Sequence, residues 1–416
     1  MIIRITMNRC MEIGNKQEMK KILLLGGSAQ QVIAIETAKR LGYYTVLCDY
    51  LTDNPGQYVA DKFYLVSTTD KEAVLDVAKS EAVDGVLAYA SDPAAPTAAY
   101  VSERLGLPTN PYKAVETLCN KDKFRQFLQS HDFNTPVARY YDSVDDALND
   151  KKLFRYPLII KPVDSSGSKG VTVLHDDTNL KEALEFGFSF SRARRIIVED
   201  FIEKKTAYLT GGDIFIKDGK VILWGLLDCH RDKNVNPLVP VGKSYPPSLD
   251  KEDLDNVKIV LQRLVDELEI KSGAMNVELI VSMDNKVWPI DIGPRCGGNM
   301  IPDLLSNIFG VDIVEMSIQS AMGEPYEVDI SIPLKCYATF NLHSAYDGTF
   351  DSLEIEAPYE KYITKKCIYK KRGDSIQYFD NASKALGIIF FEFNNAKTML
   401  DVIDNPQKWL KINLQK

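Results

Sequence analysis

Short apolar runs alternate with helical stretches from residue 20 to about residue 110. Strands of a parallel sheet read as continuous apolar runs, because helices cover both faces of such a sheet. The expected strands are at residues 20–27, 44–50, 62–66 and 84–90. The expected helices are at residues 29–41, 70–81 and 94–105. The alternation predicts an open, doubly wound α/β domain over residues 20–115.

Strands that pair as hairpins replace this alternation further along the chain. The DNK turn at 284–286 between two alternating strands is a clear hairpin signal. We therefore expect a mainly antiparallel unit over 116–326, with a subdomain at about 133–196. A small mixed unit is expected over 327–416, and residues 1–19 are expected to form an N-terminal extension. The predicted fold class is thus α/β combined with α+β.

The charge balance and the cysteines narrow the class of protein. The chain has 50 Lys and Arg against 58 Asp and Glu, a net charge of -8, which argues against wrapping nucleic acid but leaves nucleotides open as ligands. Its seven cysteines include no C-x-x-C pair, which favours reduced thiols in the cytoplasm. The apolar run at 221–227 is far shorter than the ~20 residues of a membrane span. We expect a cytoplasmic protein with neither nucleic-acid nor membrane partners.

A lysine and a glycine-rich turn follow one another in the antiparallel unit. Lys161 ends the strand LIIKP, and SSGSKG follows within ten residues. Backbone N–H groups of such a turn converge on phosphate oxygens, while a lysine adds a point charge. An ordinary hairpin turn with a surface lysine fits these residues equally well, because Gly/Ser turns are common.

Two acidic residues interrupt neighbouring apolar strands. Glu278 lies in MNVELIVS and Asp291 in WPIDIGPR, on either side of the 284–286 turn. A regular pairing around this turn sets residue 278 near residue 292, so a slip or a bulge brings the two carboxylates to one side. Converging carboxylates need a cation between them, and such oxygen ligands suit Mg²⁺. Two unrelated surface acids are the alternative, and the spacing favours the metal.

Arg295 directly follows the second of these strands, in DIGPRCGGN. A fixed guanidinium beside a metal site holds a carboxylate or the charge of a transferring group, whereas an exposed turn arginine is the ordinary alternative. The glycines after it lead into the helix MIPDLLSNIFG, whose N-terminus is another anion site. At 198–203, VEDFIE ends a strand with mixed acidic and apolar residues, as an adenine slot needs.

The order of these parts resembles the ATP-grasp superfamily, and more closely the branch of biotin carboxylase, carbamoyl-phosphate synthetase and the purine-biosynthetic ligases such as phosphoribosylamine–glycine ligase. The resemblance runs from about residue 20 to the C-terminus. It implies a pre-ATP-grasp domain, a two-part ATP-grasp domain with a glycine-rich flap, and a small C-terminal domain. It also implies ATP and Mg²⁺ as cofactors, with Mn²⁺ as an alternative metal, and small-molecule carboxylate and nucleophile substrates. Related enzymes are often dimers, so a homodimer is expected.

Site residues carry over from the family by position. Arg295 matches the catalytic arginine of the N-P-R motif, and Glu278 and Asp291 match the two Mg²⁺ ligands. The ATP-binding positions are Lys123, Lys161, Ser166, Gly167, Ser168, Gly170, Glu199, Phe201, Ile202 and Glu203. Where the family usually reads E-I-N-P-R, this chain reads D-I-G-P-R. Gly293 thus replaces an Asn that often supplies a further metal ligand, and the number of metal ions stays open.

The acceptor side offers fewer signals. Ser91 and Asp92 follow the fourth strand, at the edge where an open α/β sheet binds ligands. Further candidate substrate contacts are His230, Gly298 and Asn299.

The N-terminal glycines offer a rival interpretation. Gly26 and Gly27, with Asp49 at the end of the next strand, suggest a dinucleotide site, although the G-x-G-x-x-G spacing is absent. The leading expectation is an ADP-forming ligase that joins a carboxylate to an amine, a thiol or another nucleophile through an acyl phosphate. An NAD(P)-dependent oxidoreductase and a catalytically silent ATP-binding protein are the alternatives.

Overall fold

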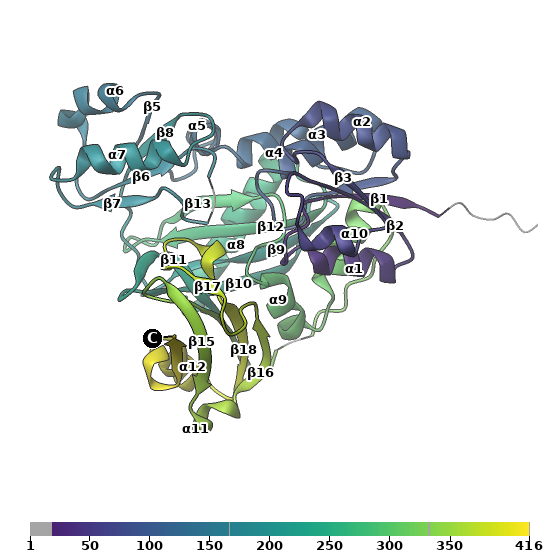
Figure 1. The fold of residues 1–416 in the computed structure, drawn as a ribbon. Coiled ribbons are helices and arrows are strands. Elements are labelled where there is room, and N and C mark those ends of the chain that lie inside the picture. Colours follow the sequence, from purple (N-terminus) through teal and green to yellow (C-terminus); the bar gives the residue numbers. More distant parts are fainter. Residues whose placement is uncertain (1–18, 166, 332, 416) are drawn as a thin grey trace, which may run out of the picture.

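A parallel four-stranded sheet in the order β3-β2-β1-β4 forms the first unit of the computed structural model, which describes residues 19–165, 167–331 and 333–415 (Figure 1). Its strands are β1 (Lys21–Leu25), β2 (Tyr44–Asp49), β3 (Lys62–Leu65) and β4 (Gly85–Leu87), and its helices are α1 (Val32–Arg40), α2 (Lys71–Glu81) and α3 (Ala95–Leu105). Ile22 and Leu24 pack with α1 on one face, and Leu23 and Leu25 pack with α2 and α3 on the other. Both faces are buried, so the doubly wound prediction is confirmed.

Two short helices, α4 (Tyr112–Leu118) and α5 (Lys121–Ser130), link this unit to the next. Asn120 between them is extended, with φ −126° and ψ 112°, so the helical ladder is interrupted there. The N–H of Lys121 instead donates to the carbonyl of Val163 at 2.9 Å. This contact fixes the start of α5 against the end of a strand in the flap subdomain.

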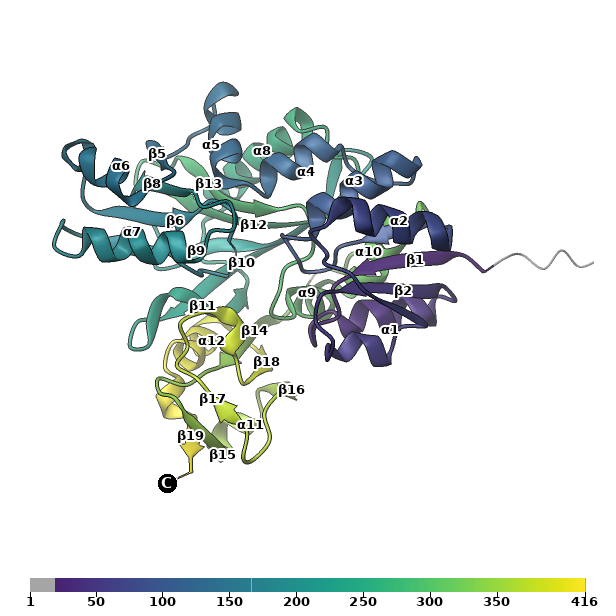
Figure 2. The same ribbon diagram turned by 45° about the horizontal axis from the view of Figure 1, so that its top comes forward.

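The flap subdomain is an antiparallel sheet in the order β5-β8-β6-β7 with two helices packed on it (Figures 1 and 2). Its elements are β5 (Ala138–Tyr141), α6 (Val144–Asn149), β6 (Leu158–Pro162), β7 (Thr172–Leu174), α7 (Leu180–Ser189) and β8 (Ile196–Asp200).

An eight-stranded sheet in the order β13-β12-β9-β10-β11-β14-β18-β16 forms the centre of the molecule. Its strands are β9 (Leu209–Lys217), β10 (Lys220–Asp232), β11 (Asn236–Tyr245), β12 (Gly273–Val281), β13 (Val287–Gly293), β14 (Cys336–Leu342), β16 (Ile363–Ile368) and β18 (Gly387–Phe393). A small sheet in the order β17-β15-β19 packs beside it, from β15 (Gly348–Ile355), β17 (Ser375–Ile376) and β19 (Leu410–Leu414). The remaining helices are α8 (Lys251–Glu267), α9 (Ile301–Phe309), α10 (Ile313–Met322), α11 (Ala357–Glu360) and α12 (Ala396–Ile403).

The large sheet passes straight through the boundary that the sequence suggested at 326/327. Strand β14 pairs with β11, and Val239 and Val241 of β11 share a core with Phe340 and Trp409. The C-terminal unit therefore has no separate sheet of its own for β14, β16 and β18.

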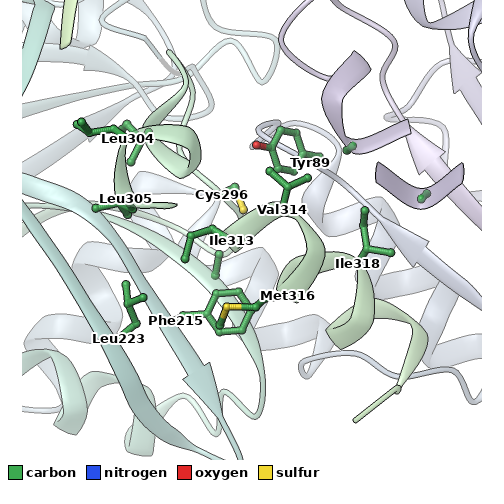
Figure 3. Close-up of a cluster of buried hydrophobic side chains, with 14 of the residues drawn as sticks. Tyr89, Phe215, Leu223, Cys296, Leu304, Leu305, Ile313, Val314, Met316 and Ile318 are labelled. Atoms are coloured by element: carbon green, nitrogen blue, oxygen red, sulfur yellow. The ribbon is translucent and has the colours of Figure 1, made fainter. Parts of the chain in front are cut away.

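A core shared between units joins α9 and α10 to strands β9 and β10 and to Tyr89 at the end of β4 (Figure 3). Phe215, Leu305 and Met316 are among its buried side chains. Among the described residues, no helix is long and apolar enough to cross a bilayer.

Candidate active site

A β-bulge sets the two acidic residues of the metal hypothesis side by side. Strands β12 and β13 pair Leu279 with Pro289, and the register then shifts by one residue so that Glu278 lies opposite Asp291. A bulge opposes two residues on one strand to one on the other and so re-aims the following side chains. This is the irregularity that the sequence pattern needed for both carboxylates to share a face.

Each of these carboxylates already has a basic neighbour. Lys121 Nζ lies 3.1 Å from Asp291, while Arg231 and Lys243 lie 3.3 and 4.0 Å from Glu278. Desolvation opposes the charge on Asp291, but Lys121 lowers the pKa of that carboxyl below its usual value.

The donor set of this pair fits Mg²⁺, which is commonly held by one or two carboxylates and completes its shell with waters and phosphate oxygens. Within the described ranges, no group of three or more His, Cys, Asp or Glu side chains is arranged to hold a metal ion. The metal hypothesis therefore rests on Glu278 and Asp291 alone.

A buried ion-pair network surrounds Glu199. Arg125 and Lys161 lie 2.6 and 2.8 Å from its two carboxylate oxygens, and the Glu199 side chain is 1% exposed. Burial opposes the charge, but Arg125 and Lys161 together lower the pKa of Glu199 to about 2. Arg125 also donates to the carbonyl of Ile290 at 2.7 Å, next to Asp291. The network thus connects α5, β6 and β8 to the strand that carries Asp291. Sequence reasoning missed Arg125, whose only signal is its position one helical turn after Lys121.

Helix α5 presents Lys121, rather than Lys123, to the carboxylates. Besides contacting Asp291, Lys121 donates to the carbonyl of Ser165 at 3.0 Å. Lys123 has a side chain that is 46% exposed and pairs with Glu116 at 2.8 Å. Side chains two positions apart on a helix do not share a face. The lysine of α5 that lies at the carboxylates is therefore Lys121, and not Lys123, which the family resemblance assigned to ATP binding.

The glycine-rich flap is a tight turn with left-handed backbone conformations. The φ values of Gly167, Ser168 and Gly170 are 68°, 63° and 72°. Two features of Gly170 disfavour a side chain there. Its φ is left-handed, and a Cβ added to it would lie 2.7 Å from Pro162. Ser168 Oγ donates to the carbonyl of Leu238 on β11 at 2.9 Å, so the flap rests against the large sheet. Ser166 lies outside the described residues.

The predicted nucleotide hinge follows β8 directly. The N–H of Phe201 donates to the carbonyl of Pro157 at 3.2 Å, and its ring is partly exposed. Ile202 is half-buried and Glu203 is exposed. Their contacts with a nucleotide stay predictions.

Arg295 pairs across units with Asp92. Its Nη2 donates to Asp92 Oδ2 at 2.5 Å, and the Arg295 side chain is 12% exposed. Burial disfavours the guanidinium charge, but the neighbouring Asp92 raises the pKa of Arg295. A Cβ on Gly293 would lie 2.4 Å from Asp92 Oδ1. The glycine that replaces the family's Asn therefore makes room for a carboxylate from the N-terminal unit.

The turn that carries Arg295 is anchored from the sheet and from the core. Asp213 accepts from the N–H of Gly297 and from the side chain of Asn276, both at 2.8 Å. Cys296 is buried in the shared core with its Sγ 3.1 Å from Ser317 Oγ, and burial raises the pKa of this thiol (Figure 3). Cys296 therefore anchors the turn. Sequence reasoning missed Asp213 because a single Asp within YLTGGDIFIK has no motif around it.

His230 and Ser91, two further predicted substrate contacts, are held by contacts within the chain. His230 is 1% exposed and is held by Asp404 at 2.7 Å and Ser244 at 2.8 Å, which fits a structural role rather than substrate contact. The carbonyl of Ser91 accepts from the N–H of Ala95, the first residue of α3, at 3.1 Å.

Gly298 and Asn299 lie against the N-terminal unit. The N–H of Asn299 donates to the Gln30 side chain at 2.7 Å, and Gly298 lies beside the same side chain. The structure thus places both residues where the large sheet meets the start of α1.

Side chains pack against the glycines of the rival dinucleotide interpretation. A Cβ on Gly26 would lie 2.3 Å from Gln31, and one on Gly27 would lie 2.1 Å from Asn54. The Asp49 carboxylate accepts from the N–H groups of Gly27 and Leu51, at 2.7 and 2.9 Å. The acid expected to bind ribose is therefore used to hold the loop.

A cavity of about 350 Å³ lies beside Asp291. Asp92, Lys121 and Ser165 line it together with Asp291, so the N-terminal unit, α5 and the flap all contribute to its wall. This arrangement suits an acceptor pocket between the units.

Comparison with known proteins assigns the fold to a family. Residues 154–303 match the family described as ATP-grasp domain. The resemblance of this chain to ATP-grasp ligases is thus confirmed.

Relatives of this ATP-grasp chain include ligases that form C–N bonds. A formate-dependent phosphoribosylglycinamide formyltransferase of Sulfurisphaera tokodaii is 25% identical over 381 residues, covering 87% of this chain and 93% of that protein. A carbamoyl phosphate synthase large chain, C-terminal section, of Aquifex aeolicus is 24% identical over 322 residues, covering 73% of this chain and 58% of that protein. This chain thus spans little more than half the length of the latter relative.

Solved structures share the fold over nearly the whole chain. An L-amino acid ligase from Bacillus licheniformis has a TM-score of 0.80 at 22% identity and covers 95% of this chain and 99% of its own. The biotin carboxylase domain of a 2-oxoglutarate carboxylase from Hydrogenobacter thermophilus was solved with MgADP, ADP and bicarbonate. It has a TM-score of 0.71 at 17% identity, and the match covers 96% of this chain and 92% of that chain. At these identities the likeness shows the fold. The predicted fold class and the ATP-grasp resemblance are confirmed, and the NAD(P)-dependent alternative is wrong.

Proposed function

We propose that this ATP-grasp protein is an ADP-forming ligase that joins a small carboxylic acid to an amine or another nucleophile through an acyl phosphate. The observation that carries the proposal is the adjacency of Glu278 and Asp291 across the β12–β13 bulge, with Lys121 bridging Asp291 to the flap. A charged site of this composition suits the triphosphate of ATP and a divalent cation. MgADP in a protein of the same fold supports ATP and Mg²⁺ as the cofactors.

The proposed reaction has two steps. First, an oxygen of the substrate carboxylate attacks the γ-phosphorus of ATP, the bond from that phosphorus to the β–γ bridging oxygen breaks, and ADP leaves with the electron pair. Second, the amine nitrogen attacks the acyl carbon, the bond from carbon to the phosphate oxygen breaks, and the nitrogen loses a proton as inorganic phosphate leaves.

The chain's own residues position and neutralise these groups. Lys121 and Lys161 hold phosphate oxygens, and the flap at 165–170 excludes water from the acyl phosphate. Arg295 steadies negative charge on the transferring group. A divalent cation held by Glu278 and Asp291 would supply further neutralisation of the β- and γ-phosphates.

A phosphate-release screen with MgATP tests this function. Amino acids, other small carboxylates and bicarbonate are each paired with a panel of amines, and ADP and phosphate are measured together. We expect equal amounts of ADP and phosphate that depend on one acid and one nucleophile. Release of AMP and pyrophosphate would contradict the proposal, and ATP binding without ADP release across the panel would support a catalytically silent ATP-binding protein instead.

A further inference from the structure

Two basic side chains approach Glu278 from neighbouring strands of the large sheet. Arg231 on β10 lies 3.3 Å from Glu278, and its Nε donates to the carbonyl of Leu238 at 3.2 Å. Lys243 on β11 lies 4.0 Å from Glu278 and donates to Cys229 Sγ at 2.7 Å. The two side chains are 16% and 9% exposed. Sequence reasoning assigned neither residue, because the contacts join strands that are far apart in the chain.

The ammonium of Lys243 has no close counter-ion in the described part of the chain, where Glu278 at 4.0 Å is its nearest carboxylate. A thiol is a weak acceptor, and burial raises the pKa of Cys229, so its sulfur carries no charge to offset the lysine. Burying a charge without a hydrogen-bonded partner of opposite sign costs several kcal/mol. The fold therefore keeps a positive charge that its own groups neutralise poorly.

A glycine and the flap lie next to the groups around Glu278. A Cβ on Gly211 would lie 2.9 Å from Cys229 Sγ and 3.2 Å from Glu278 Cγ, so the glycine leaves room for both side chains. The carbonyl of Leu238 accepts both from Arg231 and from Ser168 of the flap. Arg231 thus lies where the flap touches the sheet, beside the candidate metal carboxylate.

We propose that Arg231 and Lys243 bind the carboxylate of the acid substrate. This inference rests on the proposed function and assigns the subsite within it. Arg231 presents a planar fork that matches a carboxylate in two hydrogen bonds, and Lys243 adds a point charge. A divalent cation held by Glu278 would neutralise the charge of this glutamate, so that the substrate carboxylate would be the counter-ion for Arg231 and Lys243.

Binding of a small dicarboxylate tests the subsite. The full-length chain is saturated with MgADP and titrated with oxalate, or with inorganic phosphate, while the melting temperature is followed. We expect oxalate to stabilise the wild type more than phosphate does, and Arg231→Gln and Lys243→Met to weaken the oxalate response about tenfold or more. Lys233→Gln, which removes an exposed charge two residues from Arg231, is the matched control and should leave that response unchanged.

The stability of the ligand-free protein separates a binding role from a structural one. If Lys243 serves a ligand, Lys243→Met removes a poorly paired buried charge and leaves the melting temperature equal or higher. A lower melting temperature with an intact oxalate response would overturn the proposal.

Other results also decide the question. Stabilisation of the wild type and Lys243→Met to the same extent would overturn the proposal, as would a stronger response to phosphate or no response to oxalate while MgADP still binds. No response of the wild type to MgADP would overturn the proposed function and this subsite with it.

Discussion

Two carboxylates in this protein each face two basic side chains, at very different distances. Glu199 lies 2.6 and 2.8 Å from its partners and is 1% exposed, whereas Glu278 lies 3.3 and 4.0 Å from its partners and is 25% exposed. Short, charge-assisted hydrogen bonds in a dry setting fix geometry, because breaking them leaves buried charges unpaired. Loose, accessible pairs exchange partners at little cost. We infer that the Glu199 cluster fixes Arg125 and Lys161 in place, whereas the Glu278 cluster is arranged to exchange its partners for ligands.

The largest expected effect separates the clusters by activity. Glu278→Ala should lower turnover roughly 10²–10³-fold, because charge stabilisation in the transition state is lost, while the melting temperature changes little. Asp291→Ala should behave alike. Phosphate release and thermal unfolding measure the two quantities, and full activity in either variant would contradict the metal assignment.

Stability should show the opposite contrast. Glu199→Gln is expected to lower the free energy of unfolding by about 3–5 kcal/mol, because Arg125 and Lys161 lose their buried counter-charge. Urea unfolding measures this, with Glu203→Gln as the exposed control in the same segment. If Glu199→Gln lowered the free energy of unfolding by less than Glu278→Gln does, the two clusters would not differ as inferred.

At low pH the wild type should lose its greater stability over Glu199→Gln. The pKa of Glu199 is lowered from 4.5 to about 2, so the stabilisation from its charge is complete above pH 4.5 and is lost as the pH falls through 2. The gap in unfolding free energy between wild type and Glu199→Gln should be constant from neutral pH to 4.5 and narrow below it. A gap that stays constant in acid would show that the charge of Glu199 contributes little.

A substitution at Gly293 tests the packing beside the candidate metal carboxylates. Gly293→Asn should destabilise the protein by about 1–3 kcal/mol, because its side chain overlaps the space of Asp92. The cost should fall when Asp92→Ala is also present, which a double-mutant cycle measures. Strictly additive effects would mean that the two positions do not compete for this space.

The smallest effect concerns Lys123. Lys123→Gln removes only a surface pair and should change stability by less than about 1 kcal/mol. The KM for ATP should change by no more than about twofold. A loss of about 1.4 kcal/mol of binding energy would change it tenfold. Lys121→Gln, the matched variant two residues away, should raise the KM. Equal effects of the two variants would restore the role first assigned to Lys123.

Local patterns explain what the sequence predicted well. The α/β unit follows from apolar runs whose alternating residues pack on the two faces of one sheet, and the β12–β13 hairpin follows from its turn. The break at Asn120, which decides between Lys121 and Lys123, depends on a contact with Val163 in another element. Arg231 and Lys243 meet Glu278 only through the order of the strands. Roles of individual site residues, domain boundaries, a cytoplasmic location and a homodimer stay predictions.

The pairing of β14 with β11 also limits how such a chain can be recombined. Lys243 lies opposite Thr339 in this ladder, and a Cβ on Gly242 would lie 2.5 Å from the Thr339 carbonyl. A chain cut before Cys336 would leave β11 as an open edge, whose free N–H and carbonyl groups are a template for aggregation. The segment from Cys336 onward is therefore difficult to exchange between homologues. A replacement would have to match the backbone of β11, the strand that carries Lys243.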